Sequence, residues 1–301
     1  KFTEKEVDEI KRKTNQWISQ RPDDWHGYGY YKFKQNFFTE HPYGLSTLGE
    51  KKIIDSLTIK DLNKHYSNII QNKETIITLI GNVNKDTVTK ELTKLLSPLK
   101  FEKKDPISNS RTLHRKPFEK EIKIKQDVAA LFIGFDGTKY ANETDSLKLS
   151  LVDSILSGMN YPAGRLHNIL REKGYVYMVH ASNRVGMEDG YFLITVLTSP
   201  DKVETTKKII FDQIKDIQTK LVSDKEFEES IAQMKFYYKD RISTPAALSI
   251  ITATDELYGR KYNYYETIDS KINKLTQKDA KETAKRFLIN PQIYIFTPEK
   301  V

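Results

Sequence analysis

The chain has 301 residues, a net charge of +8 at pH 7 and no cysteine. The lack of cysteine excludes disulfides, thiolate-bound metals and a thiol nucleophile, and no apolar run approaches the roughly 20 residues that span a bilayer. The positive charge is compatible with a nucleic-acid partner. However, lysines are interleaved with acids along the chain and no nucleic-acid motif accompanies them, which favours a solvated basic surface.

The first predicted element is a helix that begins at residues 3–6 (TEKE), where a threonine cap is followed three residues later by glutamate. A matching box lies further along the chain, at residues 223–226 (SDKE). A second helix start at residues 58–61 (TIKD) is matched in the same way at residues 276–279 (TQKD). Two starts repeated at nearly the same interval indicate an internal repeat.

An apolar stripe at helical spacing follows the second start in both copies. Its positions correspond one to one: Leu62, Tyr66, Ile69 and Ile70 match Ala280, Ala284, Phe287 and Leu288. Each stripe is followed by a run of strand-forming residues, at 75–80 and at 292–296. The sequence therefore repeats with a period of about 220 residues.

The second copy is expected to form a complete domain over residues 118–301. Its predicted strands are residues 121–125, 128–135, 175–183 and 190–198, and its predicted helices include 142–156, 165–173 and 201–221. Strands that come in runs with helices behind them favour an α+β fold, with an antiparallel sheet and helices on one face. The chain is thus predicted to contain two homologous layered domains of this kind.

The first copy, residues 1–104, matches only the back part of the second copy. Its front portion is therefore expected to lie before Lys1, which leaves the first domain incomplete. Residues 105–117 are rich in charge and carry two prolines, so they are predicted to link the two domains.

Several short segments together resemble one protein family. Residues 156–159 (LSGM), 164–166 (GRL) and 170–177 (LREKGYVY) resemble a segment of pitrilysin/insulinase-type zinc metallopeptidases, and residues 41–44 (HPYG) and 80–83 (IGNV) resemble the back half of a domain of that family. The chain is also similar to processing-peptidase-like subunits. The resemblance implies pairs of homologous α+β domains of about this repeat length.

The zinc motif of that family is missing from this chain. Active members carry H-x-x-E-H on a helix, in which two histidines bind zinc and the glutamate activates the bound water. No two of the six histidines here have this spacing, and Ile10 and Trp17 occupy the places of the family's downstream glutamate pair. The resemblance therefore implies no catalytic residue and no metal ligand in this chain alone. Zinc is expected in a partner half, either fused or a separate subunit.

The resemblance also implies a role in holding a peptide substrate. In active members the half that faces the zinc site supplies an arginine and a tyrosine near the scissile bond, and by motif these are Arg171 and Tyr177. A phenol can donate to the oxyanion that forms on the scissile carbonyl, and a guanidinium offers several donors to peptide carbonyls. The alternative is structural: an arginine at a helix end contacts the last carbonyls, and a strand tyrosine packs in a core or interface.

The remaining candidates have structural interpretations. Trp17 lies on the apolar face of the first helix and is predicted to be in the core. Gly158 and Gly164 are interpreted as turn residues. Arg165 either shapes this turn or supports Arg171, of which the first is preferred, and His41 is interpreted as a loop or packing residue. The chain as a whole is either the substrate-holding half of a peptidase or a structural module of the same family.

Overall fold

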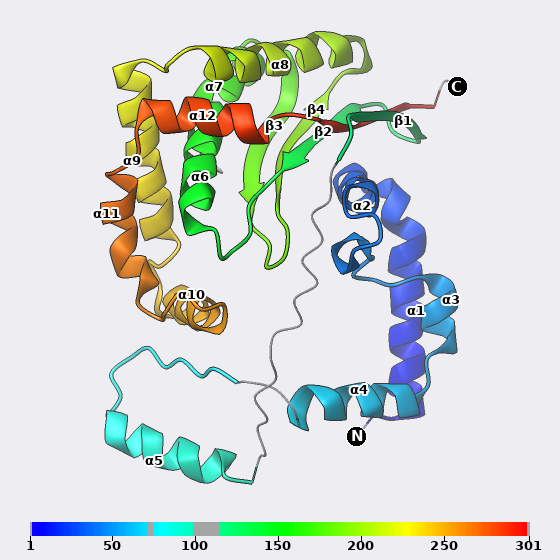
Figure 1. Cartoon of the computed structure of the whole chain (residues 1–301). Coiled ribbons are helices and arrows are strands. Elements are labelled where there is room, and N and C mark those ends of the chain that lie inside the picture. Colours follow the sequence, from blue (N-terminus) through cyan, green and yellow to red (C-terminus); the bar gives the residue numbers. More distant parts are fainter. Residues whose placement is uncertain (1, 72–74, 99–114, 160, 300–301) are drawn as a thin grey trace. The chain divides into compact units, whose positions relative to one another are not determined.

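The computed structural model describes residues 2–71, 75–98, 115–159 and 161–299 (Figure 1). Its contacts divide the chain into two compact units. Unit 1 contains the described parts of residues 1–20, 46–108 and 241–264, and unit 2 contains those of residues 21–45, 109–240 and 265–301. Within the described residues, no helix combines the length and apolarity that crossing a bilayer requires.

Unit 2 is built on one five-stranded sheet in the order β1-β5-β2-β4-β3. The strands are β1 (Phe118–Ile124), β2 (Ala129–Asp136), β3 (Val176–Arg184), β4 (Tyr191–Thr198) and β5 (Gln292–Pro298). Three neighbouring pairs are antiparallel, whereas β1 and β5 are parallel, so the sheet is mixed. The predicted α+β class is confirmed. The expectation of a purely antiparallel sheet is wrong for β1 and β5, because β5 lies between β1 and β2, antiparallel to β2 and parallel to β1.

One layer of unit 2 is a group of helices around α6, which is buried along almost its whole length. Its members are α6 (Glu143–Ser157), α7 (Gly164–Leu166), α8 (Val203–Thr219), α9 (Asp224–Asp240), α11 (Ile268–Ile272) and α12 (Gln277–Phe287). Helix α6 contacts β3, α9 and α12, and α8 contacts α12 and β2. The core of unit 2 therefore lies between this layer and the sheet.

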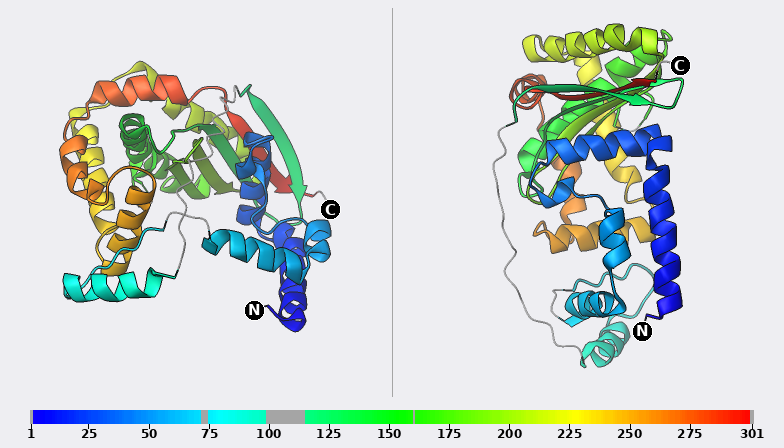
Figure 2. Two further views of the ribbon diagram at one scale, coloured as in Figure 1. Left: turned by 60° about the horizontal axis from the view of Figure 1, so that its bottom comes forward. Right: turned by 90° about the vertical axis from the view of Figure 1, so that its right-hand side faces the viewer.

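The opposite face of the sheet is covered by α2 (Trp25–Phe37), as the right-hand view of Figure 2 shows with α8 on the other side. Phe33 of α2 lies against Gly134, and Phe132 lies against Gly29. Side chains alternate along a strand, so Leu131 and Ile133 face the α6 layer. The expectation of helices on one face only is corrected, because β2 is buried on both faces.

Unit 1 contains the other α-helices of the described residues. These are α1 (Glu4–Gln20), α3 (Lys51–Ser56), α4 (Ile59–Gln71), α5 (Lys85–Leu96) and α10 (Pro245–Leu257). Short 3₁₀ turns in the chain are Arg21–Asp23, Pro42–Gly44, Pro200–Lys202 and Tyr264–Thr267. The predicted capping contacts are present at residues 3–6, 58–61 and 276–279, and Ser223 accepts from the backbone N–H of Glu226.

Two expectations for unit 1 are wrong. Residues 75–80 do not form a strand, because within the described residues no neighbouring strand pairs with them. Trp17 is not in the core but is 55 % exposed, and Ile10, on the same face of α1, is 59 % exposed. Of the predicted linker, residues 105–114 lie outside the described part of the chain. The domain boundaries predicted from the repeat stay a prediction. The two compact units are defined by contacts, and each of them combines segments from both copies of the repeat.

Candidate functional site

The connection from α6 to β3 requires backbone conformations that favour glycine. Helix α6 ends at Gly158, which has a φ of 66°, and Gly164 has a φ of 82°. A Cβ on Gly164 would lie 2.7 Å from the backbone nitrogen of Ser157, so no larger residue fits there without moving the chain. These positions agree with the interpretation of both glycines as turn residues.

Arg171 lies at the end of a π-helical turn, His167–Arg171, that follows α7. Such turns are rare and occur often at functional sites. The buried side chain of Leu170 anchors the turn, and the carbonyl of Leu170 accepts a hydrogen bond from Tyr175 at 2.9 Å. The carbonyl of Arg171 accepts from Gly174 at 3.1 Å. The backbone is thus fixed, while the Arg171 side chain is exposed.

Tyr177 lies on a bulge in the edge strand β3. Val176 is opposite Thr198 and Met178 is opposite Leu197, so Tyr177 is an extra residue between two paired positions. A bulge redirects the side chain that it carries and is common beside active sites. The Tyr177 side chain is 58 % exposed, whereas Val176 beside it is buried.

Arg171 and Tyr177 are therefore carried by two ordered elements joined by one short turn. Thr198 on β4 donates to the carbonyl of Tyr175 at 2.7 Å, and Lys202 donates to the carbonyl of Gly174 at 2.9 Å, so the turn is held from the β4 side. Within the described residues, neither Arg171 nor Tyr177 has a side-chain hydrogen bond or ion pair. The guanidinium of Arg171 and the phenol of Tyr177 are therefore available to contact a ligand. The role of the two side chains stays a prediction.

Arg165 is a structural clamp at the start of the same connection. Its Nε and Nη2 donate to the two carboxylate oxygens of Glu226 at 2.5 and 2.8 Å, and its Nη1 donates to Asp216 at 2.8 Å. These ion pairs raise the pKa of Arg165, and its side chain is 15 % exposed. Bidentate pairing of this kind fixes geometry as well as adding energy. The structure agrees with the interpretation of Arg165 as a residue that shapes the turn.

A second network was not anticipated from the sequence. Asp153 of α6 is buried, and its carboxylate accepts from the Ser157 hydroxyl at 3.0 Å and from the backbone N–H of Asn183 on β3 at 3.2 Å. Ser157 also accepts from the backbone N–H of Ala181 at 3.0 Å. Burial raises the pKa of Asp153 to about 7, because desolvation opposes the charged form more strongly than these donors favour it. The network fastens β3 to α6.

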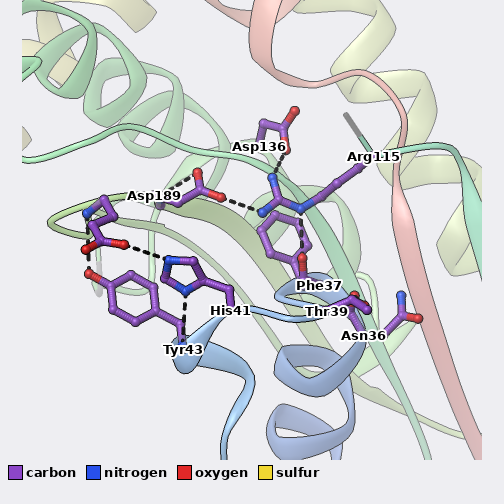
Figure 3. A network of polar contacts seen from close by, with 10 residues as sticks. Asn36, Phe37, Thr39, His41, Tyr43, Arg115, Asp136 and Asp189 are labelled. Atoms are coloured by element: carbon purple, nitrogen blue, oxygen red, sulfur yellow. Dashed lines mark hydrogen bonds and ion pairs between the residues drawn. The ribbon is translucent and has the colours of Figure 1, made fainter. Parts of the chain in front are cut away.

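A third network, shown in Figure 3, joins Arg115, just before β1, to the ends of α2 and β2 and to the loop between β3 and β4. Arg115 pairs with Asp136 and Asp189, donates to the carbonyl of Phe37 at 2.9 Å and stacks on the ring of Phe37 at 3.7 Å. Nothing in the spacing of these residues along the chain indicated that they would meet.

His41 belongs to the same region. Its Nε2 lies 2.9 Å from Glu188, and its Nδ1 accepts from the backbone N–H of Tyr43 at 3.1 Å. The hydroxyl of Tyr43 accepts in turn from the backbone N–H of Met187 at 3.1 Å. His41 is buried, in agreement with its interpretation as a packing residue.

The described residues do not fit a zinc ion. Among them, no group of three or more histidine, aspartate or glutamate side chains could hold a metal. His41 and Glu188 are close, but they offer two ligands where a protein zinc site uses at least three. His114 lies outside the described residues. No chemical step is therefore assigned to a metal on this part of the chain.

Comparison with known proteins identifies the family. Residues 56–234, more than half of the chain, match the family model of the peptidase M16 inactive domain. The chain belongs to the peptidase M16 family. The resemblance to pitrilysin/insulinase-type peptidases is thereby confirmed, and so is the non-catalytic character of the matched M16 domain.

Curated relatives and solved structures agree with this M16 assignment. An uncharacterized zinc protease of Rickettsia bellii is 28 % identical over 240 residues, which cover 78 % of this chain and 56 % of the relative. A second, from Rickettsia felis, is 26 % identical over 76 % of this chain and 54 % of its own length. The chain thus spans about half the length of the curated relatives it matches.

The fold is that of solved M16 domains. A crystal structure of a peptidase M16 inactive domain from Pseudomonas fluorescens matches with a TM-score of 0.86 and 17 % identity, over 100 % of this chain and 72 % of that one. A chain of complex III2 from Candida albicans matches with a TM-score of 0.76 and 15 % identity, over 96 % of this chain and 72 % of that one.

Proposed function

We propose that this chain is the non-catalytic, substrate-holding half of an M16 zinc metallopeptidase, and that Arg171 and Tyr177 contact the peptide near the scissile bond. The zinc ion and the H-x-x-E-H motif belong to a partner half, fused or separate. The observation that carries the proposal is the exposed Tyr177 on a bulged edge strand, in a chain that matches the M16 inactive domain.

The chemistry of the two side chains suits this role. The phenol of Tyr177 donates a hydrogen bond to the oxygen that becomes negative as the peptide carbonyl is attacked. The guanidinium of Arg171 donates to carbonyl oxygens of the peptide backbone and so fixes its position. Neither group needs a metal, so a half without zinc supplies both.

The relatives support a zinc-bearing half outside this chain. Both curated relatives are named zinc proteases, and about half of each lies outside the matched region. The zinc-bearing half is placed in a part of the assembly that this chain does not contain. The peptide is held in an extended conformation, paired with a sheet edge of that half.

The test is peptide turnover by the protease assembled from this chain and its zinc-bearing half. Tyr177→Phe removes one oxyanion donor and is expected to lower kcat about 100-fold, with the melting temperature unchanged because the side chain is exposed. Arg171→Ala is expected to raise KM and lower kcat/KM, because peptide positioning is lost.

Two control variants match these changes. Tyr262→Phe removes a phenol hydroxyl from another exposed tyrosine, which lies in unit 1, and Lys173→Ala removes a cation from the same turn as Arg171. Both are expected to keep wild-type turnover. If the correctly assembled protease with Tyr177→Phe kept wild-type turnover, the proposal would be wrong.

The second candidate function is a structural or interaction module with no role in cleavage. It is favoured by the fold match to a chain of complex III2, which covers 96 % of this chain with a TM-score of 0.76. It predicts that Arg171→Ala and Tyr177→Phe leave turnover unchanged, whereas disruption of the α6–β3 connection prevents assembly.

A further inference from the structure

Strand β1 forms one of the two edges of the sheet in unit 2, whereas Tyr177 lies on the other edge, β3. One side of β1 pairs with β5 along all seven residues of the strand. Within the described residues, no strand pairs with its other side. That side therefore presents backbone N–H and C=O groups to which a further strand can bond.

The two faces of β1 differ in how their charges are compensated. On the face towards α8, Glu119 pairs with Lys207 at 2.9 Å and Glu121 pairs with Lys123 at 2.5 Å. Lys120 lies on the opposite face, beside α2, because side chains alternate along a strand. Its side chain is exposed and has no ion pair within the part of the chain that the structure describes. The acids of β1 are thus neutralised, whereas this lysine is not.

A pocket of about 530 Å³ lies between α2 and β1. Residues four positions apart lie on one side of a helix, so Tyr28, Lys32 and Asn36 of α2 together form one wall. Lys120 and Ile122 of β1 belong to the other wall. The volume is in the range of pockets that hold small ligands. Strand β1 therefore provides both a wall of the pocket and a free edge of the sheet.

Lys32 brings a second ammonium group to this pocket. Its Nζ lies 5.5 Å from the ring centroids of Tyr28 and Tyr31, and its side chain is half-buried. Among the described residues, no carboxylate pairs with Lys32. Glu121 also borders the pocket, but its carboxylate is already paired with Lys123. The pocket therefore carries a net positive charge.

Tyr294 of β5 adds a neutral donor to the lining. Its side chain is 6 % exposed, and its ring packs against Phe118 and Phe296. Burial raises the pKa of Tyr294, so the phenol keeps its proton. Its hydroxyl has no hydrogen-bond partner within the described residues. Buried hydroxyls are usually paired, so this one is available to an acceptor that enters the pocket.

We propose that the pocket between α2 and β1 binds an extended acidic segment of a polypeptide partner, which adds to the free edge of β1 and places a carboxylate between Lys32 and Lys120. Backbone hydrogen bonds to β1 supply affinity, and the pocket selects the side chain. The two ammonium groups donate charge-assisted hydrogen bonds to the carboxylate. A peptide is favoured over a free anion, because a free anion cannot use the strand edge.

This site goes beyond the proposed function, since it lies on the opposite edge of the sheet from Tyr177. Its test is the binding of a labelled peptide to the 301-residue chain, measured by fluorescence anisotropy. The peptide has the length of β1, alternates threonine with valine, carries a central glutamate and is capped at both ends. It is expected to bind about 10-fold tighter than the same peptide with glutamine in place of glutamate. Saturating peptide should also slow hydrogen exchange of amides in residues 118–124.

Two substitutions test the lysines. Lys32→Gln and Lys120→Gln are each expected to weaken binding of the glutamate peptide about fivefold and to leave binding of the glutamine peptide unchanged. Lys34→Gln, on the same helix, and Lys125→Gln, directly after β1, are matched controls, because neither residue lines the pocket. Both controls should keep the wild-type preference for glutamate.

Equal affinity for the glutamate and glutamine peptides would overturn the proposal. So would binding without slower exchange in β1, or displacement of the peptide by an equal concentration of inorganic phosphate, because the pocket would then be a site for free anions. Lysines on edge strands also hinder self-association. Self-association of Lys120→Gln with unchanged peptide affinity would assign this lysine to that role instead. None of these results bears on turnover, so the proposed function is tested separately.

Discussion

Asp153 shows how a single buried group connects the helix layer to the edge strand that carries Tyr177. Its carboxylate receives one hydrogen bond from its own helix, through Ser157, and one from β3, through Asn183. The charge of Arg184, the residue after Asn183 at the end of β3, acts to lower the pKa of Asp153 but does not outweigh desolvation. Because a buried carboxylate is costly to ionise, the strength of this connection depends on protonation.

The first prediction concerns the pH dependence that Asp153 causes. Its pKa is raised from 3.8 to about 7 on folding, so between these values the folded protein keeps a proton that the unfolded chain has lost. Stability therefore falls as pH rises through this window, and is constant below and above it. Relative to Asp153→Asn, the wild type should lose about 2–3 kcal/mol of unfolding free energy between pH 5 and pH 8.

The measurement is urea denaturation of both proteins at a series of pH values. Other titrating groups are common to the two proteins, so their contributions cancel in the difference between the two unfolding free energies. A hydrogen bond that the asparagine makes less well than Asp153 shifts this difference by the same amount at every pH. Parallel pH profiles would show that Asp153 is ionised in the folded protein at all pH values tested.

At the scale of elements, the α6–β3 connection depends on glycines that differ in their surroundings. Gly164 and Gly174 both have positive φ values, 82° and 72°. A Cβ on Gly164 would lie 2.7 Å from the nitrogen of Ser157 and 2.8 Å from the carbonyl carbon of Leu156, whereas a Cβ on Gly174 would meet nothing within 4 Å.

Gly164→Ala and Gly174→Ala therefore form a matched pair for the second prediction. Gly174→Ala should cost about 1 kcal/mol of unfolding free energy, the penalty for a left-handed residue with a Cβ. Gly164→Ala should cost at least about 2–3 kcal/mol more, because backbone atoms must move as well. Denaturant unfolding measures both, and equal losses would mean that the connection relaxes around Gly164 at little cost.

Local signals predicted most of the elements. Capping boxes and apolar periodicity depend on residues within one turn or one stripe, and the helices they predicted from residues 3, 58, 223 and 276 are present. Residues 75–80 have the composition of a strand, but a strand exists only with a partner, which sequence composition does not supply. Trp17 has the spacing of a core residue, but burial depends on what packs against the helix.

The candidate site was predictable only in part. Arg171 and Tyr177 came from a resemblance between sequences, and their spacing alone did not indicate a bulge or a π-helical turn. The bulge at Tyr177 arises from the register between β3 and β4, a property of two strands. The Arg115 network likewise joins residues up to 78 positions apart in the chain. Contacts of this range are set by the fold as a whole.

At the scale of the whole molecule, the division into two units does not follow the sequence repeat. Helix α2 of the first copy lies in unit 2 and α10 of the second copy lies in unit 1. Each copy therefore completes the unit built on the other, so neither copy is expected to fold alone. The net charge of the chain is +8, but lysines on the described surface form ion pairs with acids. Examples are Lys208 with Asp212 and Lys51 with Asp55.

The last prediction concerns zinc and the molecule as a whole. The described residues offer no group of three or more metal ligands. The purified 301-residue chain, equilibrated with micromolar zinc and then desalted, should therefore retain far less than one zinc per mole by mass spectrometry of the metal. The protease assembled with its zinc-bearing half should retain one. One tightly held zinc in the isolated chain would contradict the assignment of the metal to the partner half. Because His114 is the histidine outside the described residues, His114→Ala would then show whether it belongs to an unrecognised ligand set.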